Sequence, residues 1–258
     1  MNWTALDLGI LLPAFLAGLL VTATHVPLGI QVLKRGIVFI DLAIAQIAGL
    51  GIMGADWLGW EPQGWKVQVA AVSAALAGAA MLTWAEKHWP DVQEATIGVS
   101  FVLAASAAIL LLAGNPHGGE HLKDLLVGQI LWVNLKMLLP VAVVYAVILA
   151  LWFGMGERLG RSGFYLLFAC AVTVSVQLVG VYLVFAGLII PALATRYFTT
   201  QRLTAAYLIS AAGYALGLAV SSIFDLPSGA VIVWTMAGIA ILVYAAQRRR
   251  AGFSRANG

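Results

Sequence analysis

Residues 177–202 read QLVGVYLVFAGLIIPALATRYFTTQR, and this stretch decides the fold that the sequence predicts. The apolar run between Gly180 and Pro191 has about ten residues, too few to cross a hydrocarbon core of roughly 30 Å as a helix. Because proline lacks a backbone N–H, Pro191 is expected to start or break a helix. Such half-crossings need cover from neighbouring helices, and they line solute pathways in transporters. An ordinary helix kinked at Pro191 is the alternative.

Composition places the chain in a membrane. Of its 258 residues 62% are hydrophobic and 10% are charged, and its mean hydropathy is +0.96, whereas soluble domains carry about 25% charged residues. We therefore predict an all-α polytopic membrane protein that forms a single transmembrane domain over residues 1–258. Eight or nine transmembrane helices are expected, one of them short or broken, depending on whether 180–191 counts as a crossing.

The other apolar segments set the expected spans. An interfacial piece at 122–132 is expected to precede a span broken near Pro140. The small-residue turn after Pro191 is expected to end the short segment. The remaining expected spans are residues 6–33, 37–58, 66–84, 96–113, 164–179, 204–223 and 229–246.

Lysine and arginine placement predicts the orientation, because cytoplasmic loops carry the excess of basic residues. With the N-terminus outside, the cytoplasmic side receives 11 of the 14 basic residues. These are Lys34, Arg35, Lys87, Arg158, Arg161, Arg196, Arg202, Arg248, Arg249, Arg250 and Arg255. The basic C-terminal cluster follows an apolar span directly, so we interpret it as a topology anchor and expect no nucleic-acid binding.

Polar side chains inside apolar spans are costly and usually face a cavity. Four stand out: His25, Asp41, Gln46 and Gln177. Asp41 has two interpretations, an ion pair with Lys34 or Arg35 and a role in a solute pathway. His25 is either a packing histidine or a metal contact. Gln46, Gln177 and Pro191 are candidate pathway residues.

The loop His117-Gly-Gly-Glu120-His121 offers two imidazoles and a carboxylate within five residues. Nitrogen and oxygen donors at this spacing can bind a divalent cation. The loop is predicted to face outward, where a metal ion would arrive. A plain polar turn is the alternative.

Motifs of common enzymes do not occur in the sequence. It has no Gly-x-x-x-x-Gly-Lys-Ser/Thr phosphate loop, no Ser-His-Asp pattern and no His-Glu-x-x-His zinc motif. We therefore expect no enzyme activity in this chain, no permanently bound cofactor, and ATP hydrolysis on a separate chain.

Several motifs, in order, resemble the permease subunits of bacterial ABC importers for zinc, manganese or iron. Pro27-Leu28-Gly29 with Leu33-Lys34-Arg35 is similar to the family's "PLG…LRR" opening, and Phe39-Ile40-Asp41 to its "FIGD" segment. Glu94 to Gly98 resembles "EDTAIG", Asp124 to Leu131 resembles "LLfGniL", and Asp225 to Gly229 resembles "D.PtG". The most specific likeness is that of Val179 to Arg196 to "vvGvlLv.aLLIIPAatAR".

The resemblance implies a type II ABC importer permease-like fold in the bacterial inner membrane. It implies a homodimer with a central path, cytoplasmic ATPase subunits, and an extracytoplasmic metal-binding protein that delivers the ion. After the aspartate the family commonly carries Ser-His, whereas this chain has Ile44-Ala45-Gln46. That departure weakens the transfer of metal contacts to this span.

By similarity to larger ABC importers, the loop before the signature stretch couples to the ATPase. In this chain that loop is 154–163, which contains Glu157, Arg158 and Arg161. The loop lacks the family's usual "DpelA" motif. Arg196 and Arg202, after Pro191, are the second candidates for coupling. The alternative is that Arg158 and Arg161 only anchor the loop at anionic lipid headgroups.

The competing function is an ion-coupled secondary metal carrier that acts without an ATPase. It predicts buried acidic residues in several spans, and only Asp41 lies clearly within one. The sequence does not choose among zinc, manganese and iron. We favour zinc because two imidazoles suit it better than the oxygen-rich sites that manganese prefers.

Overall fold

A computed structural model describes residues 7–60, 64–112 and 125–256. This part of the chain is helical and contains no strand. Short 3-10 helices lie at η2 (Pro90–Val92), η3 (Ile130–Trp132) and η4 (Gly156–Leu159). The α-helices are α1 (Leu8–Arg35), α2 (Ile40–Trp57), α3 (Trp65–His88), α4 (Gln93–Leu112), α6 (Leu135–Met155), α7 (Gly160–Val179), α8 (Val181–Ala194), α9 (Arg202–Phe224) and α10 (Ser228–Ala256).

Among the described residues, eight helical segments are long and apolar enough to cross a membrane. Only α8, with 14 residues, is too short for that. The all-α polytopic fold with one short helix is therefore confirmed. The boundaries differ from the expected ones by a few residues: α3, for example, continues to His88, where a loop was expected from residue 86.

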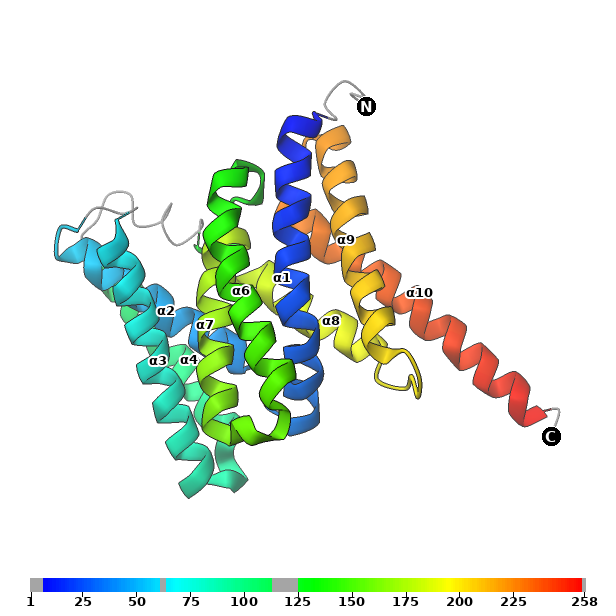
Figure 1. Cartoon of the computed structure of the whole chain (residues 1–258), viewed down its shortest axis with the longest axis horizontal. Coiled ribbons are helices and arrows are strands. Elements are labelled where there is room, and N and C mark those ends of the chain that lie inside the picture. The colour runs from blue at the N-terminus through cyan, green and yellow to red at the C-terminus, as the bar shows by residue number, and fades with distance from the viewer. Residues whose placement is uncertain (1–6, 61–63, 113–124, 257–258) are drawn as a thin grey trace.

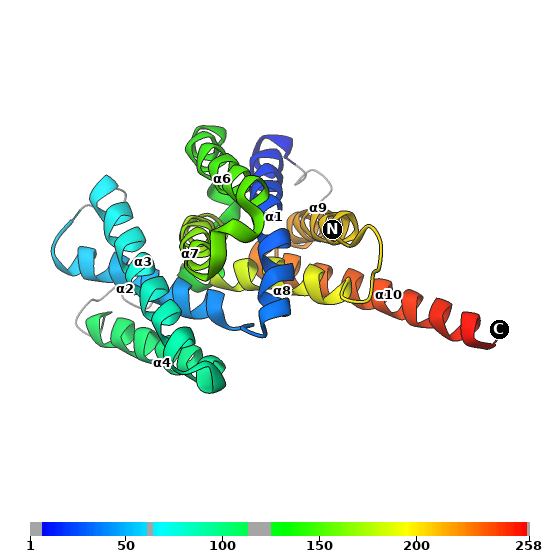
Figure 2. The ribbon, with the colours of Figure 1, turned by 60° about the horizontal axis from the view of Figure 1, so that its bottom comes forward.

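Figure 1 shows α1, α6 and α7 upright in the middle, α2, α3 and α4 on one flank, and α9 and α10 on the other. The short helix α8 crosses between the two flanks. In Figure 2, α4 lies at the lower left and α10 extends to the right, with α2 and α8 between them. α8 packs against α1, α9 and α10.

Two expectations about proline are wrong. Pro191 does not end the short segment, because α8 continues to Ala194. Pro140 does not break its span either, because it lies inside the continuous helix α6. A proline in a helix removes one hydrogen bond and its ring presses on the carbonyl of residue i−4. For Pro191 that residue is Gly187, which has no side chain to add to the crowding. For Pro140 it is Lys136, which lies in the first turn of α6.

Local capping sets two of the helix starts. The Asp7 carboxylate accepts a hydrogen bond from the Gly9 N–H at 2.7 Å at the start of α1. The Asn134 side chain accepts one from the Met137 N–H at 3.1 Å at the start of α6. Such caps satisfy amide groups that have no partner within the helix.

Three glycines permit two close backbone approaches around α8. A Cβ added to Gly29 of α1 would lie 2.0 Å from the Leu188 carbonyl oxygen of α8. Gly128 and Gly180 have φ of 71° and 82°, and a Cβ on Gly180 would lie 2.3 Å from the Gly128 nitrogen. The segment before α6 is thus fitted against the start of α8. The expected interfacial piece, 122–132, is described from residue 125 onward and includes η3.

The basic helix ends meet on one side. Glu86 at the end of α3 lies 4.0 Å from Arg35 at the end of α1 and 3.8 Å from Arg161 at the start of α7. This common side is the one that the basic residues assign to the cytoplasm.

Candidate functional site

A groove of about 650 Å³ lies between α2, α4, α8 and α10. Its floor is formed by buried lining residues, Gln46 of α2 and Ala186 of α8. Its walls are almost wholly apolar. The lining residues are Leu42, Gln46, Phe101, Ala105, Ile109, Leu126, Val181, Tyr182, Phe185, Ala186, Ile190, Ala230, Val233 and Trp234.

Gln46 is the buried polar side chain of this groove. It is 3% exposed, and its Oε1 has no hydrogen-bond partner among the described residues. Gln46 therefore presents an unused carbonyl oxygen at the floor. Tyr182 and Trp234 lie at the open side, where they are 54% and 79% exposed.

Asp41 lies in the first turn of α2 and is 1% exposed. Neither of its carboxylate oxygens has a hydrogen-bond partner in the described part of the chain. The ion pair with Lys34 or Arg35 is therefore not found, and Arg35 instead reaches Glu86. The positive end of the α2 dipole favours a negative charge at this position, but a buried carboxylate without a partner remains costly.

Asp41 adjoins the groove without facing it. Leu42, the next residue, lines the groove, and successive side chains of a helix point about 100° apart. Asp41 shares its face of α2 with the buried Ala45. The carboxylate is thus enclosed beside the groove.

His25 lies on the face of α1 that packs against α8 and α9. The same face carries Gly18, Thr22 and Gly29, spaced by four, three and four residues. A Cβ on Gly18 would press on the Tyr214 ring of α9, and Gly29 meets α8. His25 is enclosed between these two contacts.

The ring of His25 is held at its Nδ1, which lies 3.0 Å from the Val21 carbonyl oxygen and 3.0 Å from the Thr24 hydroxyl oxygen. Because the carbonyl oxygen can only accept, Nδ1–H donates to it. The other ring nitrogen, Nε2, is buried and has no partner among the described residues. The ring is held by its own helix and keeps one free acceptor. The two interpretations of His25 both remain open.

Gln177 lies apart from Gln46. It is exposed near the end of α7 and lines a second, more polar cavity of about 360 Å³ with Asp56, Gln68 and Gln129. Pro191 is buried within α8. The structure therefore does not bring Gln177, Gln46 and Pro191 into one cavity.

The metal-loop residues His117, Glu120 and His121 lie outside the described residues, in 113–124. Among the described residues no group of three His, Cys, Asp or Glu side chains could hold a metal ion. The metal loop stays a prediction.

Arg161 is the loop residue that touches the bundle. Its side chain is 66% exposed, yet it lies 3.8 Å from Glu86, which is 13% exposed. The Arg35 guanidinium lies 4.4 Å from the centre of the Phe164 ring of α7. Arg158 is exposed in η4, which also contains Glu157. Glu86 was missed in the sequence, where it fell in a polar loop between two spans.

The turn between α8 and α9 contains the second pair of coupling candidates. Arg202 donates a hydrogen bond from Nη2 to the Ala192 carbonyl oxygen at 3.2 Å, which ties the start of α9 to the end of α8. Arg196 is exposed at the other end of the turn. Arg161 and Arg196 thus leave their guanidinium groups accessible, whereas Arg202 holds the fold.

The sequence pattern of the ABC 3 transport family matches residues 7–159 and 153–247. PsaBC from Streptococcus pneumoniae in complex with Fab is 21% identical, with a TM-score of 0.71 over 92% of this chain and 90% of that chain. A structure described as an inward-facing conformation of a metal-chelate type ABC transporter is 16% identical, with a TM-score of 0.70 over 91% and 85%. No curated protein matched the sequence.

The two solved structures share the fold of this chain. At 21% and 16% identity, the likeness supports a conclusion about the fold alone. The family match extends over nearly the whole chain and agrees with the eight apolar helices. The resemblance found in the motifs is therefore confirmed. This chain belongs to the ABC 3 transport family, as a multi-pass permease of the bacterial inner membrane and a transport subunit rather than a catalytic one.

Proposed function

We propose that this chain is the membrane-spanning subunit of an ATP-driven importer that moves a divalent metal ion, zinc first and manganese or iron next, into the cytoplasm. The observation that carries the proposal is Asp41, a buried carboxylate whose two oxygens have no partner among the described residues. A passing cation would supply the missing charge. Gln46 adds an unused oxygen five residues further along α2.

Transport by alternating access requires Asp41 to become reachable from the groove. A rotation of α2 about its axis, or a shift of the neighbouring α8, would bring the carboxylate from its enclosed place to the groove. The side chain that follows Asp41 on the same face of α2, Ala45, is small and leaves few atoms to displace.

Asp41→Asn tests the proposal. The isosteric amide removes the charge, and in proteoliposomes with the ATPase we expect metal uptake to fall at least tenfold, about 1.4 kcal/mol of lost interaction. We expect the thermal midpoint to stay equal or rise, because an unpartnered buried charge is removed. Asp225→Asn, at the exposed end of α9, is the matched control. Loss of stability with normal uptake per folded molecule would make Asp41 structural and overturn the proposal.

We propose that a second copy of the chain covers the groove and completes the path. The groove is apolar, and its large exposed lining side chains are Ile109, Tyr182 and Trp234. A two-fold axis here would place both copies of Gln46 around one channel. Trp234→Cys in a Cys170→Ser background is expected to form an intermolecular disulfide. A strictly monomeric chain in nanodiscs would refute this arrangement.

Coupling to the ATPase is proposed at Arg158 and Arg161, with Arg196 and Arg202 as the second site. The exposed Arg161 supports this choice, because a partner's carboxylate could reach it while it contacts Glu86. Charge reversal at Arg158 and Arg161 is expected to release the ATPase from a correctly inserted permease. If the variant still binds the ATPase and transports metal, the proposed site at Arg158 and Arg161 is wrong, and the turn at Arg196 becomes the candidate.

Zinc delivery is proposed through His117, Glu120 and His121, together with an extracytoplasmic metal-binding protein. Replacing both histidines by alanine should raise the zinc concentration needed for half-maximal uptake, with manganese uptake as the comparison. If variant and parent take up zinc equally at limiting zinc, the loop takes no part in zinc delivery. Metal uptake by the purified chain alone, driven by a proton gradient, would instead favour the secondary carrier.

A further inference from the structure

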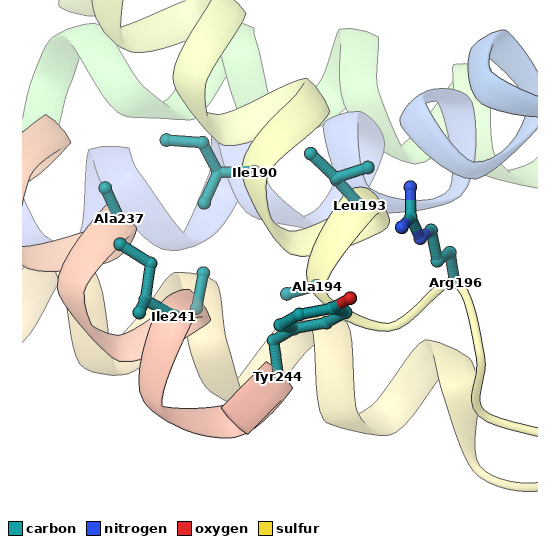
Figure 3. A pocket seen from close by; sticks show the side chains of 8 residues that line it. Ile190, Leu193, Ala194, Arg196, Ala237, Ile241 and Tyr244 are labelled. Atoms are coloured by element: carbon teal, nitrogen blue, oxygen red, sulfur yellow. The ribbon is translucent and has the colours of Figure 1, made fainter. Parts of the chain in front are cut away.

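A second apolar cavity, of about 450 Å³, lies between the C-terminal end of α8 and the middle of α10. Figure 3 shows Ile190, Leu193 and Ala194 of α8 facing Ala237 and Ile241 of α10 across it. From Ala237 to Tyr244 the cavity follows α10 for seven residues, about 10 Å at 1.5 Å per residue. It is thus an elongated slot that could hold part of one acyl chain.

The rim of this cavity is cationic and aromatic. The guanidinium of Arg196 lies 4.5 Å from the centre of the Tyr197 ring and 6.0 Å from that of Tyr244. In Figure 3, Arg196 and Tyr244 stand at the same end of the slot. Stacking over aromatic rings uses the face of the guanidinium and leaves its N–H edges available for an anion. No ion pair of Arg196 occurs in the described part of the chain.

The charge around this rim is of one sign. From residue 181 onward the sequence has six arginines and a single acidic residue, Asp225. Asp225 caps the far end of α9, whose 23 residues span about 35 Å from Arg202. α10 continues past Tyr244 through the segment that contains Arg248, Arg249 and Arg250. An anionic group at the rim therefore meets no carboxylate from α8, α9 or α10.

These features fit a lipid better than a soluble anion. The slot opens near the basic ends of the helices. The distribution of arginines assigns these ends to the cytoplasmic side, so the slot faces the cytoplasmic leaflet. That leaflet carries anionic lipids, and basic pockets between helices bind their headgroups. A soluble phosphate would use Arg196 but would leave the apolar slot empty.

We propose that the slot between α8 and α10 binds one anionic phospholipid of the cytoplasmic leaflet, with an acyl chain between Ile190 and Ile241 and the phosphate on Arg196. Lipid binding at this site requires neither the metal ion nor the ATPase. Its test is therefore independent of the proposed transport function.

The test measures lipid retained by the purified chain. The protein in detergent is incubated with equal amounts of phosphatidylglycerol and phosphatidylcholine, and bound lipid is counted by native mass spectrometry. We expect the parent chain to retain phosphatidylglycerol preferentially. Arg196→Gln should reduce that preference about tenfold, as expected for a hydrogen bond to a charged group. Lys87→Gln, at an exposed position near the end of α3, should leave it unchanged.

A second pair of variants tests the slot itself. Ala237→Phe fills the cavity and should lower the retention of both lipids, whereas Ala246→Phe, on an exposed position of α10, should not. Ala240→Leu replaces Ala237→Phe if the larger side chain prevents folding. Three results overturn the proposal: no preference in the parent chain, equal loss with Lys87→Gln, or full retention with a filled slot. An Ile241→Cys disulfide between two copies would also overturn it, because a partner would then occupy the slot.

Discussion

Gly29 offers a direct test of the contact between α1 and α8. A Cβ at this position would lie 2.0 Å from the carbonyl oxygen of Leu188, whereas ordinary van der Waals contact begins at 3.4 Å. Gly29→Ala must therefore separate the two helices by about 1.4 Å. The obstructing atom belongs to the backbone of α8, so it cannot move away by changing a rotamer.

The expected cost follows from overpacking. Adding atoms to a closely packed interior destabilises by roughly 1–3 kcal/mol. In a domain of about 150–250 residues each kcal/mol lowers the melting temperature by about 2–4 °C. Gly29→Ala should therefore lower the midpoint by roughly 2–12 °C.

The assay heats the purified chain in detergent and measures by size exclusion the fraction that remains monodisperse. Gly98→Ala in α4 is the matched control, because an added Cβ there meets nothing within 4 Å. Alanine is about 1 kcal/mol better than glycine inside a helix, so the control should be unchanged or more stable. If Gly29→Ala melts no lower than Gly98→Ala, the close approach of α1 and α8 is refuted.

Three further changes follow from local contacts, each measured with the same heating assay. Gly180→Ala should destabilise the chain more than Gly29→Ala does. The added Cβ would be strained at a φ of 82° and would also lie 2.3 Å from the Gly128 nitrogen. A smaller effect would contradict the backbone contact. Asn134→Ala should cost about 1 kcal/mol through loss of the N-cap of α6, and Asn134→Asp should restore it; equal loss in both would exclude capping. Glu86→Gln should cost at most about 1 kcal/mol of stability, because the ion pairs with Arg35 and Arg161 are partly exposed. The difference in stability from the parent should become smaller in high salt. A loss that does not depend on salt would indicate a packing effect instead.

Hydropathy and charge predicted the part of this fold that depends on the membrane. A span needs about 20 apolar residues, so the crossings and the short helix after Gly180 could be predicted from the sequence. The effects of Pro140 and Pro191 could not, because the cost of a proline depends on the residue four positions earlier and on the helices around it.

The candidate site was predictable only as single residues. Asp41 and Gln46 stood out because polar groups are rare in apolar spans, yet the groove depends on α4, α8 and α10 meeting α2, which no local pattern encodes. Of the two interpretations of Asp41, the ion pair with Lys34 or Arg35 is not found among the described residues, because Arg35 contacts Glu86 of α3 instead. Glu86 carries no such signal, since an acidic residue near a loop is ordinary in sequence.

The position of α8 explains why the most specific motif of the chain lies there. One side of α8 meets the α1 backbone at Gly29, its start meets Gly128, and Phe185, Ala186 and Ile190 form part of the groove. Its end leads directly into the turn that contains Arg196, and Arg202 is bonded back to it at Ala192. Contacts with Gly128, Gly29 and Arg202 hold α8 at its start, along one side and at its end, so we expect the helix to move as one body. A displacement of the turn at Arg196 must therefore move α8 as a body, and with it the floor of the groove next to Asp41.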